Sequence, residues 1–195
     1  MHRTFQRAGF TPAAEVRYMT NRIKTVQYPK LIFVMCKNSA RISELVSDIL
    51  NFCSYNTCID VFSENTDFVI SGSVCGGEIP EGIIADTAIV DETCSRLKET
   101  SVFRKVVAPY EYAASELEDD ERLLTFSVDN YSADVACRNI SVHGDSTVFD
   151  VVSGGILSRA RINSSLYSVE EVLTCISVLI AAGIPLAPVL SYFNR

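Results

Sequence analysis

The segment KLIFVMCKNSARISELVSDIL, residues 30–50, constrains the fold most, because it changes from strand to helix within a few residues. Residues 31–34 form a short apolar run that is typical of a strand covered on both faces. From Ile42 to Cys53, apolar residues recur at helical spacing and polar residues take the opposite face. Asn38 or Ser39 is the expected N-terminal cap. A buried strand that turns directly into a helix favours an α/β fold.

Later segments continue the alternation. Five further apolar runs predict strands, at 57–63, 67–74, 86–90, 104–110 and 123–128. Helical spacing or composition predicts helices at 94–103, 111–123 and 168–182, the last ending at Gly183. HGDS predicts the turn of a β-hairpin between residues 140–142 and 148–152. We therefore predict an α/β fold with a mainly parallel sheet flanked by helices and a β-hairpin in the C-terminal half, preceded by an N-terminal arm or helix over residues 1–28.

The charge and cysteine patterns exclude several classes of function. The formal net charge is −7 without a basic run, which disfavours nucleic acid and anionic membranes as partners. Seven cysteines without a C-x-x-C pair, and only two histidines, argue against a zinc site and for reduced, buried thiols in a cytoplasmic protein. The uncharged stretch 172–193 contains Pro185 and Pro188, so we expect buried helical pieces there and no membrane span.

A separate acid/base or cysteine site is one interpretation of several polar residues. Asp91 and Glu92 follow an expected strand, where sites of α/β proteins form, and Asp129 and Asp134 precede the hairpin. Cys94 and His143 would have to meet across the fold to act as a dyad. We favour the structural interpretation, in which such carboxylates cap chain turns and the histidine lies in a surface turn.

Several stretches, taken in order, resemble a known family. They are FVISGSVCGGEIPEGIIAD, ADTAIVDET, KVVAPYEYA, LLTFSVDNYSADVACRNISVHGDSTVFDVV and LYSVEEVLTCISVLIAAGI. Together they resemble the ATP-binding central domain of the Mur ligases, which join amino acids to a UDP-sugar peptide in peptidoglycan synthesis. The resemblance runs from Leu31 to Ile184, and implies a P-loop-like domain over residues 29–195.

The resemblance also locates the family's phosphate loop, G-T-N-G-K-T, in this chain. It falls on six consecutive residues: Met35, Cys36, Lys37, Asn38, Ser39 and Ala40. A phosphate loop needs glycines for close backbone approach, a lysine for the phosphate charge and a hydroxyl for Mg²⁺. Met35 and Asn38 replace the glycines, Ser39 the lysine and Ala40 the threonine. The neighbouring Lys37 is most simply a solvated turn residue.

Other catalytic positions of the family are also changed. The glutamate and histidine of its E-V-S-S-H segment fall on Ile70 or Ser71 and near Val74, and its N-V-x-N segment reads Ser168-Val169-Glu170-Glu171. We therefore predict a degenerate, non-catalytic domain, without catalytic residues, metal ligands or a cofactor. Its predicted role is binding or assembly linked to peptidoglycan-precursor metabolism. The alternative is an ATP- and Mg²⁺-dependent ligase that forms amide bonds and needs a partner subunit.

The apolar C-terminal segment GIPLAPVLSYFNR, residues 183–195, is the candidate surface for a homodimer or a protein partner. The other interpretation, in which this segment folds back on its own sheet, remains open.

Overall fold

The computed structural model of the chain describes residues 28–61, 63, 65–72, 84–93, 102–117 and 121–195. Among these residues the strands are β1 Lys30–Met35, β2 Thr57–Ile59, β3 Phe68–Ser71, β4 Thr87–Val90, β5 Val106–Pro109, β6 Leu123–Ser127, β7 Val135–His143, β8 Ser146–Ser153 and β9 Ile156–Asn163. The helices are α2 Ser39–Phe52, α3 Tyr110–Glu116, α4 Val169–Ala181 and α5 Leu186–Phe193.

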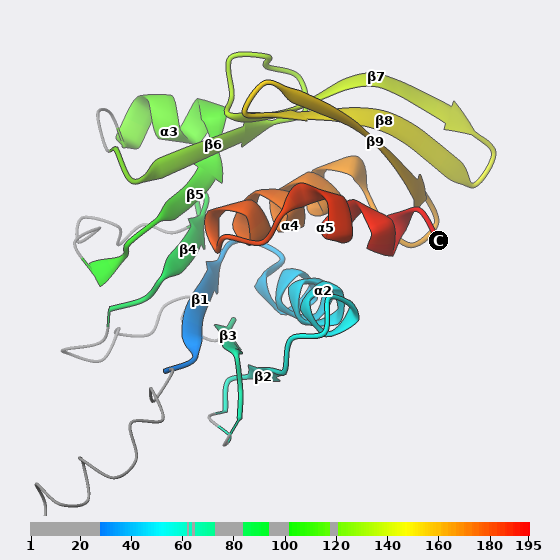
Figure 1. The fold of residues 1–195 in the computed structure, drawn as a ribbon. Helices are drawn as coiled ribbons and strands as arrows, with labels where there is room; N and C mark the ends of the chain where they lie inside the picture. Colours follow the sequence, from blue (N-terminus) through cyan, green and yellow to red (C-terminus); the bar gives the residue numbers. More distant parts are fainter. Residues whose placement is uncertain (1–27, 62, 64, 73–83, 94–101, 118–120) are drawn as a thin grey trace, which may run out of the picture.

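All nine described strands join one sheet, in the order β2-β3-β1-β4-β5-β6-β7-β8-β9. Pairing is parallel from β2 to β7 and antiparallel for β7-β8 and β8-β9. Helices α2, α4 and α5 cover one face, and α3 lies on the other beside β5 and β6 (Figure 1). The predicted α/β class and mainly parallel sheet are therefore confirmed.

Two apolar clusters hold these layers together. The larger lies between the sheet and helices α2, α4 and α5, and includes the fully buried Val46, Phe149 and Ile176. The smaller lies on the opposite face and includes Phe33 and Phe103, whose rings meet edge to face. Because both faces of the parallel strands are buried, β1 and β4 read as continuous apolar runs rather than as alternating ones.

The C-terminal half contains the predicted hairpin and one further strand. The predicted turn at Gly144-Asp145 is present, but β8 continues through Gly154-Gly155 into β9, so the unit is a three-stranded meander. The sequence ILSRARIN hides this strand, since its core-facing positions include Ser158 and Ala160, which carry little apolar signal. A bulge interrupts the β7–β8 pairing between Arg138 and Ser141, and Asn139 there has φ 53°.

Several predicted boundaries were too long. The expected strands 57–63 and 67–74 are described as Thr57–Ile59 and Phe68–Ser71, and the acidic helix 111–123 ends at Glu116. Acidic side chains at the C-terminal end of a helix oppose its dipole, which is consistent with this early end. The predicted arm 1–28, except Tyr28, and the helix 94–103, except for its last two residues, lie outside the described residues.

The C-terminal segment folds back on the domain. Val189, Leu190, Tyr192 and Phe193 of α5 are buried, and α5 packs against α2, α4 and β9. Gly183 has φ 88° just after α4, the left-handed conformation that glycine adopts at little cost. No helix among the described residues is long and apolar enough to cross a membrane.

Candidate functional site

The turn between β1 and α2 is short and mostly closed by its own backbone. Met35 ends β1 and Ser39 begins α2, so only residues 36–38 lie between them. Within the turn, the Ser39 amide donates to the Cys36 carbonyl at 3.0 Å. Asn38 occupies the N-cap position of α2 without a side-chain capping bond. The predicted succession of strand, turn and helix is therefore present, while the side-chain capping bond of Asn38 is absent.

The side chains of this turn point to different places. Met35 is buried in the smaller cluster and Cys36 in the larger one, so both help to anchor the turn in the core. Lys37, Asn38 and Ala40 are exposed, and Ser39 is half-buried. The turn therefore presents one exposed ammonium group, but no glycine that would let a phosphate reach several backbone amides at once.

A carboxylate of the chain itself accepts a hydrogen bond from one backbone amide of this turn. Met35 pairs with Val90 in the β1–β4 register, so Asp91 emerges next to the turn at the carboxyl end of the sheet. Asp91 Oδ2 accepts a 2.8 Å hydrogen bond from the Lys37 amide, and Asp91 Oδ1 accepts from the Thr93 amide at 2.9 Å. An anion thus already lies against the amide that an incoming phosphate would need.

The first turn of α2 is also tied to α4. Arg41 Nε lies 2.6 Å from Glu171 Oε1, and Arg41 Nη2 donates to the Leu166 carbonyl. Glu171 also completes a capping box with Ser168, with hydrogen bonds of 2.9 and 3.1 Å between them. The segment Ser168–Glu171, where the family has N-V-x-N, therefore caps α4 and pairs with α2.

Two of the described thiols, those of Cys137 and Cys175, are made unreactive by burial. Burial raises the pKa of Cys137 to about 12, aided by the charge of Asp129. Burial also raises the pKa of Cys175 well above its ordinary value, with smaller effects of Cys36 and Glu171. A raised pKa keeps a thiol protonated and unreactive near neutral pH. Cys94, the other half of the considered dyad, lies outside the described residues.

The remaining candidate residues are separated across the fold. His143 ends β7, where its Nε2 lies 2.9 Å from Ser141 Oγ. Asp134 accepts from both the amide and the hydroxyl of Thr125 at 2.8 Å, which ties the loop before β7 to β6. The described residues contain no group of histidine, cysteine and carboxylate side chains able to hold a metal ion.

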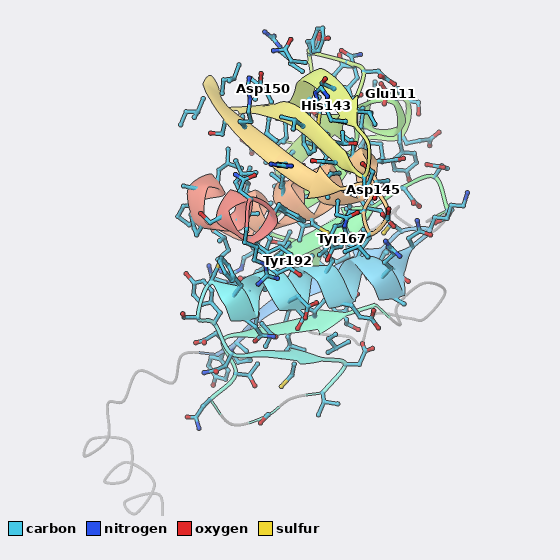
Figure 2. All side chains as sticks on the ribbon, turned by 90° about the vertical axis from the view of Figure 1, so that its right-hand side faces the viewer. Glu111, His143, Asp145, Asp150, Tyr167 and Tyr192 are labelled. Carbon is cyan, nitrogen blue, oxygen red and sulfur yellow. The ribbon has the colours of Figure 1, made fainter. Side chains whose placement is uncertain are left out.

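Two surface cavities lie away from the turn. One of about 540 Å³ lies between the β7–β8 turn, the end of β9 and the last residues of the chain, near His143 and Asp145 (Figure 2). The other, of about 230 Å³, lies between Tyr28, Tyr55 and Ile184, at the amino-terminal ends of β1 and β3. Neither is lined by residues of the β1–α2 turn.

Comparison with solved structures identifies the fold. A UDP-N-acetylmuramoyl-L-alanyl-D-glutamate–2,6-diaminopimelate ligase matches 91% of this chain and 48% of its own, with a TM-score of 0.65 and 14% identity. The chain has a Mur ligase-like fold. MurF from Acinetobacter baumannii matches with a TM-score of 0.61 and 11% identity, over 87% of this chain and 46% of its own.

A third solved structure is also similar to this chain. Folylpolyglutamate synthetase from Lactobacillus casei matches 97% of this chain and 68% of its own, with a TM-score of 0.53 and 10% identity. The chain thus spans about half the length of the first two ligases. No family model matches the sequence, and no curated protein matches it.

The sequence pointed to the site but not to its contacts. Asp91 was noted because carboxylates after α/β strands are often functional, yet its bond to the Lys37 amide depends on the β1–β4 register. The sequence did not predict the contacts of Arg41, because its partners Leu166 and Glu171 lie 125 and 130 positions later in the chain.

Proposed function

We propose that this chain is a degenerate Mur ligase-like domain without ligase chemistry, acting in the cytoplasm by binding or assembly in peptidoglycan-precursor metabolism. The observation that carries the proposal is the 2.8 Å hydrogen bond from the Lys37 amide to Asp91. A carboxylate held there repels a phosphate and removes one of the few amides available to it. The proposed cytoplasmic location agrees with the free thiols of four described cysteines, Cys53, Cys58, Cys137 and Cys175.

Two further observations support the absence of catalysis. Phosphoryl transfer depends on positioned cations and metal ions that stabilise negative charge. Here Ser39 stands at the lysine position, and Arg41, the nearest arginine on α2, is paired with Glu171. The domain keeps its apolar framework around this turn, with Val34 and Val46 fully buried. Such a framework serves a binding domain without needing a phosphate loop.

Calorimetric titration of the purified chain with ATP and Mg²⁺ tests the proposal. We expect no saturable heat at micromolar ATP and no release of phosphate. A chain carrying Asp91→Ala is the matched comparison, because it removes the internal carboxylate and leaves the rest of the turn. Micromolar, Mg²⁺-dependent binding with hydrolysis by the unaltered chain would overturn the proposal.

The second candidate function is an ATP-dependent ligase that forms amide bonds together with a partner subunit. The exposed ammonium group of Lys37 beside the start of α2 is the observation that favours it. Amide formation by a reconstituted complex, dependent on this chain and lost on Lys37→Ala, would establish this function. Amide formation that survives Lys37→Ala would remove Lys37 from the chemistry.

A further inference from the structure

The outer side of the β7–β9 meander carries a group of arginines that no described helix covers. Cys137, Phe149 and Ala160 point into the core, so their neighbours along each strand face outward. Figure 1 shows α4 and α5 on the inner side only. We call the outward side the arginine face and define it by six residues, Arg138, Val148, Asp150, Leu157, Arg159 and Arg161.

The strand register places these arginines in neighbouring rows. Arg138, Asp150 and Arg159 lie directly opposite one another across the three strands, and Val148 lies opposite Arg161 in the next row. Opposing side chains in such rows lie within contact distance. On the other side of the Asp150–Arg159 row, Val152 lies opposite Leu157, which is 56% exposed. The arginine face therefore combines cationic and apolar groups.

The single carboxylate of the arginine face is already neutralised. Asp150 is only 2% exposed, since Arg159 Nε donates to its Oδ1 at 2.9 Å and Asn139 Nδ2 to its Oδ2 at 2.8 Å. The Arg159 hydrogen bond, followed by that of Asn139, lowers the pKa of Asp150, so it stays ionised and bound. Arg138 instead stacks on Tyr131, 4.8 Å from the ring centroid. Three arginines against one occupied carboxylate leave the arginine face net positive, on a chain whose net charge is −7.

The neighbouring sheet edge is partly closed to a partner strand. The Asn194 side chain accepts from the Arg161 amide at 2.8 Å and donates to the Arg159 carbonyl at 3.1 Å, as a paired strand would do. A partner that added a strand to β9 would have to displace this amide. The open surface is therefore the arginine face and not the edge.

We propose that the arginine face docks an acidic segment of a partner protein. Arginine beside exposed apolar groups is the composition of protein interfaces, and its planar guanidinium binds carboxylates in a two-point geometry. Nucleic acid and anionic membranes fit less well than a short acidic segment, because their negative charge extends beyond the arginine face and over the rest of a chain with net charge −7. The inference deepens the proposed binding role and rests on it.

Selection from a random-peptide display library against the purified chain tests the proposal. We expect peptides enriched in Asp and Glu with apolar neighbours. Arg161→Glu and Arg138→Glu should each weaken binding of a selected peptide about fivefold, which corresponds to the upper value of about 1 kcal/mol for an exposed ion pair. The binding should also weaken as salt rises. Thermal unfolding checks that each variant is folded, and Arg161→Gln provides a milder second change.

Lys105→Glu, an equal change of charge at an exposed site before β5, is the matched control and should leave peptide binding unchanged. Three results would overturn the proposal: no enrichment of acidic peptides, an equal loss with Lys105→Glu, or self-association that Arg161→Glu abolishes, which would make a second copy the occupant. None of these results bears on nucleotide binding, so failure here is distinguishable from failure of the non-catalytic assignment.

Discussion

At the scale of single residues, carboxylates join separate elements of this domain to one another. Asp91 joins the end of β4 to the β1–α2 turn, and Asp134 joins the loop before β7 to β6. Glu171 joins α4 to α2 through Arg41. Most of these carboxylates follow strands or cap helices, and their polar partners are mainly backbone amides. These carboxylates at the ends of strands therefore stabilise the fold.

Asp91→Ala should lower the free energy of unfolding by about 1 kcal/mol, because a hydrogen bond of this kind contributes about that much. The lost bonds are those from the amides of Lys37 and Thr93 and from the Thr93 hydroxyl. Urea unfolding followed by circular dichroism measures the change. Glu92→Ala, at the exposed neighbouring position, is the control and should have almost no effect. Equal unfolding midpoints for both variants would show that the Asp91 contacts do not hold the turn.

Asp150 makes stability depend on acid pH. Its pKa is lower in the folded chain than in the unfolded chain, so its contribution is complete above the unfolded value of about 3.9 and is lost as pH falls through the folded value. Urea midpoints measured from about pH 6 downward should therefore fall more steeply for the unaltered chain than for Asp150→Asn. Parallel pH profiles for the two chains would contradict this assignment.

At the scale of elements, the parallel strands could be predicted because burial on both faces gives continuous apolar runs, as in β1 and β4. The strand β9 could not, since its inward positions include the half-buried Ser158 and the buried Ala160, while arginines occupy its outward positions. The length of α3 was overestimated because acidic residues were counted as a solvated helical face. The site could be placed at the β1–α2 turn, but its Asp91 contact could not, because register is a tertiary property.

The capping box of α4 gives a prediction about an element. Ser168→Ala should lower the free energy of unfolding by about 1 kcal/mol, since it removes the hydroxyl that accepts from the Glu171 amide. Ser165→Ala, an exposed serine in the preceding turn, is the control. Chemical denaturation of both variants measures the difference. A loss in Ser165→Ala equal to that in Ser168→Ala would contradict a role of the cap.

At the scale of the whole molecule, α5 completes the core. Truncation after Gly183 removes five buried side chains, Ile184, Val189, Leu190, Tyr192 and Phe193. Each contributes roughly 1.5–3 kcal/mol, so their sum is comparable with the total stability of roughly 5–15 kcal/mol of a typical domain. Size-exclusion chromatography with light scattering should show an aggregated or unfolded truncation, while removal of Arg195 alone should leave the folded species unchanged.

The same chromatography addresses the prediction that residues 183–195 contact a homodimer or a protein partner. A dimer of the intact chain that is lost on substitution of exposed positions such as Ser191 would support it. A folded monomer of the intact chain, together with a folded monomeric truncation, would contradict both the partner contact and the core role of α5.

The central claim is that the β1–α2 turn has lost phosphate binding. Titration of the ¹⁵N-labelled chain with ATP and Mg²⁺, followed by NMR at the amides of Lys37, Asn38 and Ser39, tests it most directly. We predict that these three signals stay in place, because Asp91 already occupies the Lys37 amide and no glycine opens the turn. Saturable shifts of the same signals at micromolar ATP would contradict the claim.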